Sequence, residues 1–492
     1  MYYISTRGGS EKKTSARVIK QGLAEDGGLF VPESIPTVSK DFIKKLAEED
    51  YAHRAADVLS LYLTDYTYDE LLSAATDAYK EESFGKYAAP VKSLDKTHKV
   101  LELWHGPTCA FKDMALQIMP RLLSTALKKT GEKRTALILV ATSGDTGKAA
   151  LEGYKDVDGV KIMVFYPEDG VSDIQKLQMA SQEGENVNVC AIKGNFDDAQ
   201  TGVKQIFSDT NIAKELDEKG YFLSSANSIN WGRLAPQIVY YFSAYCDLMN
   251  AGDITLGDEI DVCVPTGNFG NIFAAYLAKK MGLPVRRFIC ASNVNNVLTD
   301  FINTGIYDRN RQFHTTISPS MDILISSNLE RLLWLIQGEE KTAECMKLLK
   351  ETGKYEVSAE VREKIASEFI GCFASDDETK QTIAETFEKH SYLIDTHTAV
   401  ALFAAKKNAT DIPVVTASTA SPYKFAADVL SALTGNRDNG NDFFRILREL
   451  NAKTGAAVPR PLAALENKTR RFTTSVGKSK DEMFAEVAKF AD

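Results

Sequence analysis

The chain has 492 residues, with 58 Lys and Arg against 67 Asp and Glu, so its formal net charge at pH 7 is −9. Its 44% hydrophobic and 25% charged residues match an ordinary globular protein and exclude a disordered chain or a fibrous repeat. The acidic balance argues against a nucleic-acid partner, because basic runs are as short as Lys12-Lys13 and Arg470-Arg471. At about 150 residues per domain, the length predicts roughly three domains.

The cysteine pattern and the apolar runs indicate the compartment. No Cys-x-x-Cys pair occurs, which disfavours a disulfide framework or a metal site and predicts free, buried thiols. The N-terminus lacks the apolar core of a signal peptide, and no run of about 18 apolar residues occurs. We therefore expect a cytoplasmic protein with no membrane partner. The seven cysteines are residues 109, 190, 246, 263, 290, 345 and 372.

The first 92 residues differ in texture from those that follow. Phe42, Ile43 and Leu46 recur at helical spacing, and a similar pattern covers residues 58–63. This periodicity predicts an N-terminal, mainly helical domain over residues 1–92.

From Val100 onward, short apolar runs are each followed by a glycine-rich turn and a helical pattern. This order is typical of parallel βαβ units, so the sequence predicts an α/β fold. Between about residues 305 and 390 the strand signal fades into charged helical patterns, which predict a helical insertion. Strands are expected at residues 136–141, 161–166, 187–192, 260–264, 287–291 and 414–417.

A glycine loop, Thr266-Gly-Asn-Phe-Gly-Asn271, separates one of these strands from a helical pattern ending near Gly282. Such a loop directs free backbone N–H groups and the positive end of a helix dipole at one point, which suits a phosphate. It matches neither a Walker loop nor the Gly-x-Gly-x-x-Gly of dinucleotide-binding folds. From spacing alone, anion binding and a simple chain turn carry equal weight.

Lys112 follows a strand and a Gly-Pro turn and lies beside apolar neighbours such as Phe111 and Met114. Removal from water lowers the pKa of a lysine, and an unprotonated amine is what an imine-forming lysine needs. Taken alone, however, a lysine is far more often a solvated surface charge than a catalytic amine. Pro120 is expected to kink or end the helix that follows.

Four segments are much more specific in combination than each is alone. They are residues 105–113 (HGPTCAFKD), 141–147 (ATSGDTG), 265–271 (PTGNFGN) and 418–425 (STASPYKF). In this order and spacing they resemble the threonine synthase family, and the resemblance extends to residues 22–33, 227–234 and 395–400. It implies a fold-type-II pyridoxal 5'-phosphate enzyme. The implied reaction converts O-phospho-L-homoserine and water to L-threonine and phosphate by γ-elimination and β-addition of water.

The resemblance also implies roles for individual residues. Lys112 matches the Schiff-base lysine, which afterwards moves protons at the substrate's Cα and Cβ. Thr419 matches the hydroxyl opposite the pyridine nitrogen, with Thr416 and Ser418 as nearby alternatives. The residues that match the cup for the cofactor phosphate are Gly267, Asn268, Phe269, Gly270 and Asn271.

On the substrate side, Thr142, Ser143, Asp145 and Thr146 match the loop that grips the substrate carboxylate and approaches the cofactor's phenolic oxygen. An ionised Asp145 beside a phenolate is repulsive, so it must be protonated, turned away or paired with a cation. Its alternative role is to cap the helix that enters at Gly147.

Cationic side chains are needed for the leaving phosphate, and Lys148, Arg233 and Lys424 are the candidates. His105 and His397 lie in matching segments, where each either contacts the substrate or is a hydrogen-bonded structural residue. No metal site is expected.

The implied fold is that of tryptophan synthase β-like proteins, with two α/β domains around a cofactor cleft. We expect residues 125–235 in a small domain and residues 93–124 and 236–492 in a large cofactor-binding domain. The expected partner is a small-molecule substrate, and the expected state is a monomer or weak homodimer. Alternatives are another fold-type-II lyase, such as a serine or threonine dehydratase, or an inactive threonine synthase-like binding protein.

Overall fold

A computed structural model describes residues 1–142, 144–168, 171, 173–436 and 442–492. Its centre is a six-stranded sheet in which five strands are parallel and only the edge strand β3 is antiparallel. Its strands are buried, apolar runs because helices cover them, as in other parallel sheets. In spatial order the strands are β13 (Phe369–Phe373), β10 (Val285–Ser292), β9 (Ile260–Pro265), β14 (Val414–Ser418), β4 (His98–Glu102) and β3 (Val91–Ser93).

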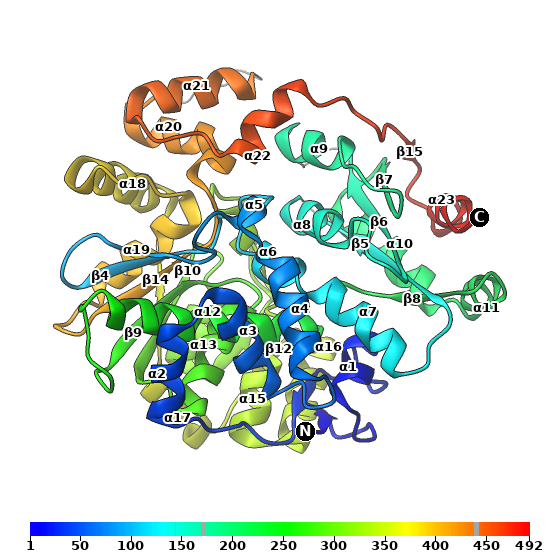
Figure 1. Ribbon diagram of the computed structural model, residues 1–492, viewed down its shortest axis with the longest axis horizontal. Helices are drawn as coiled ribbons and strands as arrows, with labels where there is room; N and C mark the ends of the chain where they lie inside the picture. The colour runs from blue at the N-terminus through cyan, green and yellow to red at the C-terminus, as the bar shows by residue number, and fades with distance from the viewer. Residues whose placement is uncertain (143, 169–170, 172, 437–441) are drawn as a thin grey trace.

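A second sheet lies to the right of the first in Figure 1 and is parallel throughout. The six strands predicted in the two sheets are confirmed, each within two residues of its expected bounds. In spatial order the second sheet contains β15 (Ser475–Val476), β7 (Val187–Ile192), β6 (Val160–Pro167), β5 (Thr135–Ala141) and β8 (Tyr221–Ser224).

The N-terminal region is mainly helical, as predicted, with one short hairpin of β1 (Tyr3–Ser5) and β2 (Phe30–Pro32). It packs on the long helix α12 (Trp231–Asn250), whose Trp231 ring lies between the rings of Tyr3 and Tyr62. Its helices are α1 (Ser15–Gln21), α2 (Lys40–Glu48), α3 (Tyr51–Ser60), α4 (Tyr68–Ala78) and α5 (Glu81–Phe84).

The remaining helices surround the two sheets (Figure 1). Pro120 stands in the first turn of α7, so the helix is interrupted between α6 and α7, as expected. Around the second sheet lie α6 (Asp113–Leu116), α7 (Met119–Lys129), α8 (Asp145–Tyr154), α9 (Asp173–Ala180), α10 (Phe196–Ser208) and α11 (Thr210–Glu218). The first sheet and the C-terminal region carry α13 (Gly270–Met281), α14 (Val297–Thr304), α19 (Thr396–Lys407), α20 (Ala426–Thr434), α21 (Phe443–Thr454), α22 (Arg460–Ala463) and α23 (Lys480–Ala491).

The insertion predicted over residues 305–390 is not purely helical. It contains α15 (Leu329–Gln337), α16 (Glu339–Thr352), α17 (Ala359–Glu368) and α18 (Asp376–His390), but also three strands. The prediction missed β13, which pairs with β10 at the edge of the main sheet. This five-residue run follows a charged helix directly and contains Gly371, where an added Cβ would lie 2.9 Å from the backbone of Thr299. The other two strands are β11 (Ile306–Asp308) and β12 (Lys354–Glu356).

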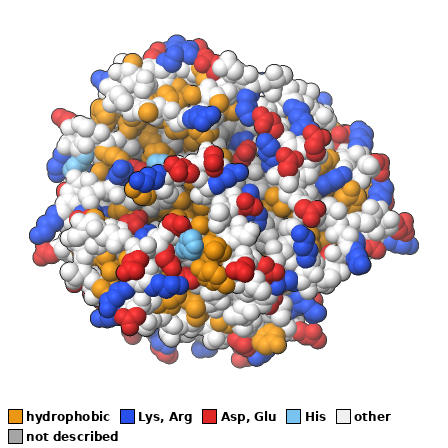
Figure 2. Space-filling view, in the orientation of Figure 1, with side chains coloured by type: hydrophobic (Ala, Val, Ile, Leu, Met, Phe, Trp, Pro, Cys, Tyr) orange, Lys and Arg blue, Asp and Glu red, His pale blue; other side chains and the backbone are white. Residues whose placement is uncertain are grey.

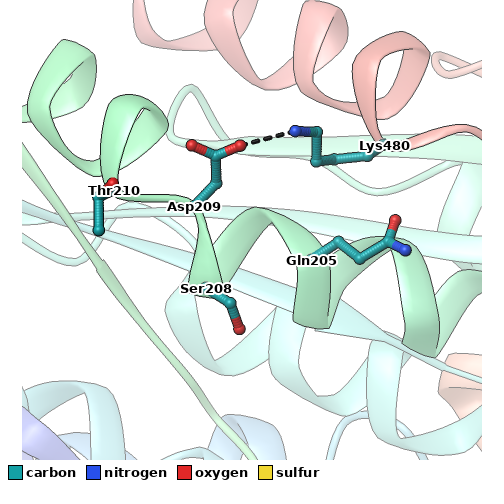
Figure 3. Close-up of a pocket in the computed structure, with 5 residues that line it drawn as sticks. All are labelled: Gln205, Ser208, Asp209, Thr210 and Lys480. Atoms are coloured by element: carbon teal, nitrogen blue, oxygen red, sulfur yellow. Dashed lines mark hydrogen bonds and ion pairs between the residues drawn. The ribbon is translucent and has the colours of Figure 1, made fainter.

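The C-terminal segment also departs from the prediction, which assigned residues 236–492 to the large domain. Strand β15 pairs with β7 of the second sheet, and α23 packs against α10. Lys480 of α23 donates to Asp209 at 2.6 Å, beside the pocket that Figure 3 shows. The pattern of this segment indicates a helix but not which sheet it joins, because pairing partners are set in space.

The sequence predicts free, buried cysteines and no membrane-spanning segment. All seven cysteines are free and buried, which confirms the prediction. Among the described residues, no helix is both long and apolar enough to cross a membrane. Figure 2 shows cationic and anionic side chains interspersed on one face of the molecule.

Candidate functional site

The predicted site residues gather at the carboxyl edge of the main sheet, where parallel strands β4, β9 and β14 end. In sheets of this kind, ligands bind outside the carboxyl ends of the strands. The loop after β4 joins the end of β14: Leu103 N donates to Ser418 O at 3.0 Å, and Phe111 N donates to Thr419 O at 2.8 Å. These bonds bring Lys112 beside a segment that lies three hundred residues later in the chain.

Lys112 stands at the start of α6, and its side chain is 13% exposed. Among the described residues, its Nζ makes no hydrogen bond, and its nearest carboxylate oxygen is Asp145 Oδ2 at 3.8 Å. Burial lowers the pKa of Lys112 below its ordinary value, and the charges of Lys424 and Arg233 lower it further, whereas Asp145 opposes them. Lys112 is therefore buried as expected, but charged side chains as well as apolar ones surround it.

Asp113 fixes the turn that carries Lys112. Its carboxylate accepts hydrogen bonds from the Thr108 amide at 2.8 Å and from the Thr108 hydroxyl at 2.7 Å. Burial raises the pKa of Asp113 to about 6 despite these bonds. Cβ of a residue at position 106 would lie 2.6 Å from Asp113 Cβ and Oδ2, so Gly106 allows this close approach.

The glycine loop between β9 and α13 forms a cup of backbone groups. Phe269 adopts a left-handed φ of 61° just before Gly270 begins the helix, whose first amides have no acceptor within the helix. Tyr241 donates its hydroxyl to Asn271 Oδ1, which fixes the amide and leaves the buried Nδ2 without a partner in the described structure. The loop thus offers backbone and side-chain N–H donors to an anion.

Helix α15 braces this cup, and this contact was not predicted from the sequence. Asn328 donates its backbone N and Nδ2 to Asn268 O at 3.0 and 2.9 Å. Arg331, fully buried, donates to Asn328 Oδ1, to Phe30 O of the N-terminal hairpin and to Ile229 O. The one available signal was an arginine among the apolar positions of an amphipathic helix.

The hydroxyls of Thr416, Ser418 and Thr419, near the end of β14, differ in whether they are free to bind a ligand. Ser418 Oγ accepts a hydrogen bond from Trp104 Nε1 at 3.0 Å and is hydrogen-bonded to the Thr398 hydroxyl at 2.9 Å. Thr398 gives its one proton to Asp395 Oδ1, so the proton of Ser418 occupies the bond to Thr398 and is not free for a ligand. In the described part of the chain, the hydroxyls of Thr416 and Thr419 have no hydrogen bond, and that of Thr416 is buried. Thr419 is 7% exposed and directly follows the strand.

The loop after β5 is held from within by Thr142. The Thr142 hydroxyl accepts from Gly144 N at 3.0 Å and from Gly147 N at 2.9 Å, and so binds the amide just before α8 and one amide of its first turn. Thr146 is half-buried, and Ser143 lies outside the described residues. The capping role considered for Asp145 is wrong: α8 begins at Asp145, and Thr142 supplies the bonds.

Asp145 is instead paired with a cation, one of the three possibilities raised by the sequence. Its Oδ1 lies 2.6 Å from Lys424 Nζ and 3.0 Å from Gln175 Nε2. Burial alone would raise the pKa of Asp145, but the charges of Lys424 and Lys112 outweigh it and lower the pKa below the ordinary value. The carboxylate is therefore ionised.

The three candidate phosphate-binding cations are not equivalent. Lys148 donates to Glu152 and Gln182, and Lys424 donates to Asp145. Arg233 donates Nη1 to Ala226 O at 2.6 Å, whereas its buried Nε has no partner among the described residues. Burial lowers the pKa of Arg233 to about 10.

Both histidines are hydrogen-bonded to carboxylates. His397 Nδ1 lies 2.8 Å from Asp395 Oδ2, and its Nε2 accepts the Ser320 amide at 3.1 Å. With both ring nitrogens used, His397 holds the loop of Ser320, whose carbonyl faces Gly267. His105 Nε2 pairs with Glu102 Oε2 at 2.7 Å. No group of metal-ligating side chains is found among the described residues.

Comparisons with known proteins cover almost the whole chain. Three family models match: "Threonine synthase N terminus" at residues 2–79, "Pyridoxal-phosphate dependent enzyme" at residues 100–416, and "Threonine synthase, C-terminal" at residues 398–484. The human protein "Threonine synthase-like 1" is 42% identical over 452 residues, which cover 88% of this chain and 60% of that protein. The chain thus spans about three fifths of the length of the threonine synthase-like 1 relatives.

Two further relatives are matched over nearly their full length. The threonine synthase of Pseudomonas aeruginosa is 40% identical over 443 residues, which cover 88% of this chain and 91% of that protein. The crystal structure of a pyridoxal-phosphate-bound threonine synthase from Brucella melitensis superposes with a TM-score of 0.89 at 36% identity, covering 100% of this chain and 99% of that one. This chain therefore belongs to the threonine synthase family of pyridoxal-phosphate-dependent enzymes.

Proposed function

We propose that the chain is a threonine synthase, which converts O-phospho-L-homoserine and water to L-threonine and phosphate. The observation that carries the proposal is the Lys112 amine, buried and without a hydrogen bond, at the same sheet edge as the 267–271 cup. The family matches support it along the chain. A cytoplasmic location and a monomeric or weakly dimeric state are part of this proposal.

The residues at this edge fit pyridoxal phosphate. The free amides at the start of α13 and the unpartnered Asn271 Nδ2 suit its phosphate, and the Thr419 hydroxyl suits its pyridine nitrogen. Burial lowers the pKa of Lys112 and so favours the unprotonated amine that attachment to an aldehyde requires. When bound, the cofactor would withdraw electrons from the carbon atoms of the substrate.

Lys112 is then the base at the reacting carbons. An Nζ with no hydrogen-bond partner in the described structure can, in its unprotonated form, take a proton from the substrate's Cα. It can take a second proton, from Cβ, only after it has given up the first. A neutral hydroxyl such as that of Thr419 does not keep the pyridine nitrogen protonated as a carboxylate would. We therefore assign the proton transfers to Lys112 rather than to either histidine, since both histidines are held by carboxylates.

The substrate phosphate leaves from Cγ and needs a donor. Lys148 and Lys424 are committed to internal partners, whereas Arg233 Nε is buried and unused. A buried guanidinium binds a phosphate more strongly than one in water, because the local dielectric is lower. Arg233 is thus the cation we propose for the phosphate of the substrate.

A direct assay tests this function. O-phosphohomoserine should yield threonine and inorganic phosphate in equal amounts, homoserine should be inert because it lacks the leaving group, and added phosphate should inhibit competitively. In isotopically labelled water, the Cβ hydroxyl of threonine should carry solvent oxygen. Threonine without solvent oxygen would refute the mechanism.

The same assay separates the alternatives. Deamination of serine or threonine to the keto acid, faster than threonine formation, would replace the proposal with a dehydratase. Cofactor binding with no turnover of any of these substrates would indicate a binding protein of the same family.

A further inference from the structure

Asp145 is shared unequally between two lysines. Its Oδ1 lies 2.6 Å from Lys424 Nζ, within hydrogen-bond distance, whereas its Oδ2 lies 3.8 Å from Lys112 Nζ, beyond it. The side chains of Asp145 and Lys424 are 6% and 1% exposed, so water does not screen this arrangement. Gln175 Nε2 adds a further bond to Oδ1 at 3.0 Å and holds the carboxylate toward Lys424.

Two buried ammonium groups beside one carboxylate leave one positive charge uncompensated, and such a charge is costly in a dry site. The lysine with fewer acceptors is the one that loses its proton. Lys424 donates both to Asp145 and to Thr108 O at 3.1 Å, so an ammonium is solvated there by the protein. Lys112 has no such bonds in the described structure, and the ring centroid of Phe111 lies 5.6 Å from its Nζ.

We propose that Lys424 is a positioning residue that binds the Asp145 carboxylate and thereby keeps Lys112 from forming a hydrogen-bonded ion pair with it, so that Lys112 remains an amine able to receive the cofactor. This inference rests on the proposed role of Lys112. It assigns Lys424 to charge compensation within the protein rather than to the substrate phosphate. It also explains how an ionised Asp145 is tolerated in this site.

The pair joins regions that the sequence keeps far apart. Asp145 begins α8 beside the second sheet, whereas Lys424 lies in the 3-10 turn Pro422–Phe425 that follows β14 of the main sheet. Without Lys424, Lys112 is the one cationic side chain of the described residues that still lies within 4.0 Å of the Asp145 carboxylate. The carboxylate would then close the 3.8 Å gap and stabilise the protonated form of Lys112.

The test is the pH dependence of cofactor capture by the full chain, freed of cofactor with an amine scavenger and dialysed. Capture forms one carbon–nitrogen double bond between Lys112 Nζ and the pyridoxal phosphate aldehyde and releases one water, and it is followed by visible absorbance. For Lys424→Met, the midpoint of the rate–pH profile should rise by about one unit or more, because an opposite charge now faces Lys112 alone. Below the midpoint, that shift slows capture about tenfold.

Companion variants make the result specific. Asp145→Asn should lower the midpoint, Lys424→Arg should keep it near the parent value, and Asp145→Asn with Lys424→Met should return it toward the parent value. Lys99→Met is the matched control, since Lys99 is 2% exposed and donates to Asp253 at 2.6 Å away from this loop cluster. It should destabilise the fold without moving the midpoint.

Other outcomes overturn the inference. A parent-like midpoint in Lys424→Met, or a double variant as impaired as the single one, would show that Lys424 does not act through Asp145. A shift in Lys99→Met as large as that in Lys424→Met would reduce the effect to general destabilisation. Failure of the proposed function is distinguishable, because Lys112→Ala would then capture the cofactor as the parent does.

Discussion

The loops at the edges of the two sheets differ in how much of their polar chemistry is already used. Beside the main sheet, Lys112 Nζ and Asn271 Nδ2 have no hydrogen-bond partner in the described structure. In the loop from the second sheet, the side chains of Thr142, Asp145 and Lys148 are all bonded within the protein. The first edge is thus prepared for a ligand, whereas the second must exchange internal bonds before it can bind one.

This difference has a physical consequence for the two edges. An unused buried donor carries the cost of its lost hydration until a ligand supplies an acceptor, so a ligand gains the full bond. A donor that already has a partner offers only the difference between two bonds. Substitutions at the main-sheet edge are therefore expected to affect the cofactor directly. Those at the second-sheet loop are expected to affect local stability and, at Asp145 alone, the charge on Lys112.

The largest effect is expected from removing the amine itself. Lys112→Ala should lower turnover of O-phosphohomoserine by about a thousandfold or more, since one group supplies both the cofactor attachment and the proton transfers. Its circular dichroism spectrum should match that of the parent, because Lys112 Nζ makes no hydrogen bond in the described structure. Substantial turnover in this variant would remove Lys112 from the mechanism.

A second prediction concerns the cup. An added Cβ at Gly267 would lie 3.0 Å from Ser320 O and 3.5 Å from Met321 Cα, so Gly267→Val must displace backbone on which the cup rests. We expect cofactor retention after dialysis to fall about tenfold, the equivalent of about 1.4 kcal/mol.

The matched control for the cup is Gly270→Ala. There the nearest atom to an added Cβ is Asn328 Nδ2 at 3.4 Å, an ordinary contact distance, so retention should fall much less. Equal retention in Gly267→Val and the parent would contradict the argument. A side chain at Gly267 would thus meet protein backbone atoms of Ser320 and Met321.

The loop from the second sheet is tested by Thr142→Ala. The variant leaves the Gly144 amide, just before α8, and the Gly147 amide, in its first turn, without their acceptor. It should cost about 1–2 kcal/mol of unfolding free energy, as the loss of a helix cap does. Thr142→Ser retains the hydroxyl and should recover most of that loss. Denaturant unfolding measures both; an unchanged midpoint in Thr142→Ala would show that the loop is not held by this side chain.

The smallest effect is expected at the end of β14. Thr419→Ala should lower turnover only about two- to fivefold, the range of one neutral hydrogen bond, and should perturb the cofactor absorbance spectrum. Ser418→Ala should leave the spectrum unchanged, because Ser418 Oγ serves Trp104 and Thr398. A larger spectral change in Ser418→Ala or Thr416→Ala would move the contact to that residue.

Much of this architecture was available from local patterns. The strands of the two sheets that are buried apolar runs were predicted within two residues, because burial on both faces leaves a continuous apolar signal. The segment around Lys112 and the glycine loop were identified from motifs whose order resembles one enzyme family. In each case, the relevant information lies within about ten neighbouring residues.

Local patterns were insufficient where a residue's partner lies elsewhere in the chain. The edge strand β13 was missed because it is short and follows a charged helix, and the pairing of β15 with β7 was not predicted because pairing is decided in space. The ionised state of Asp145 follows from Lys424, which only the meeting of the two sheets' loops brings within 2.6 Å. The sequence by itself determined which residues are buried in strands and helices and which carry reactive groups; tertiary packing alone decided their partners, because Coulomb energy and hydrogen bonding depend on distance in space.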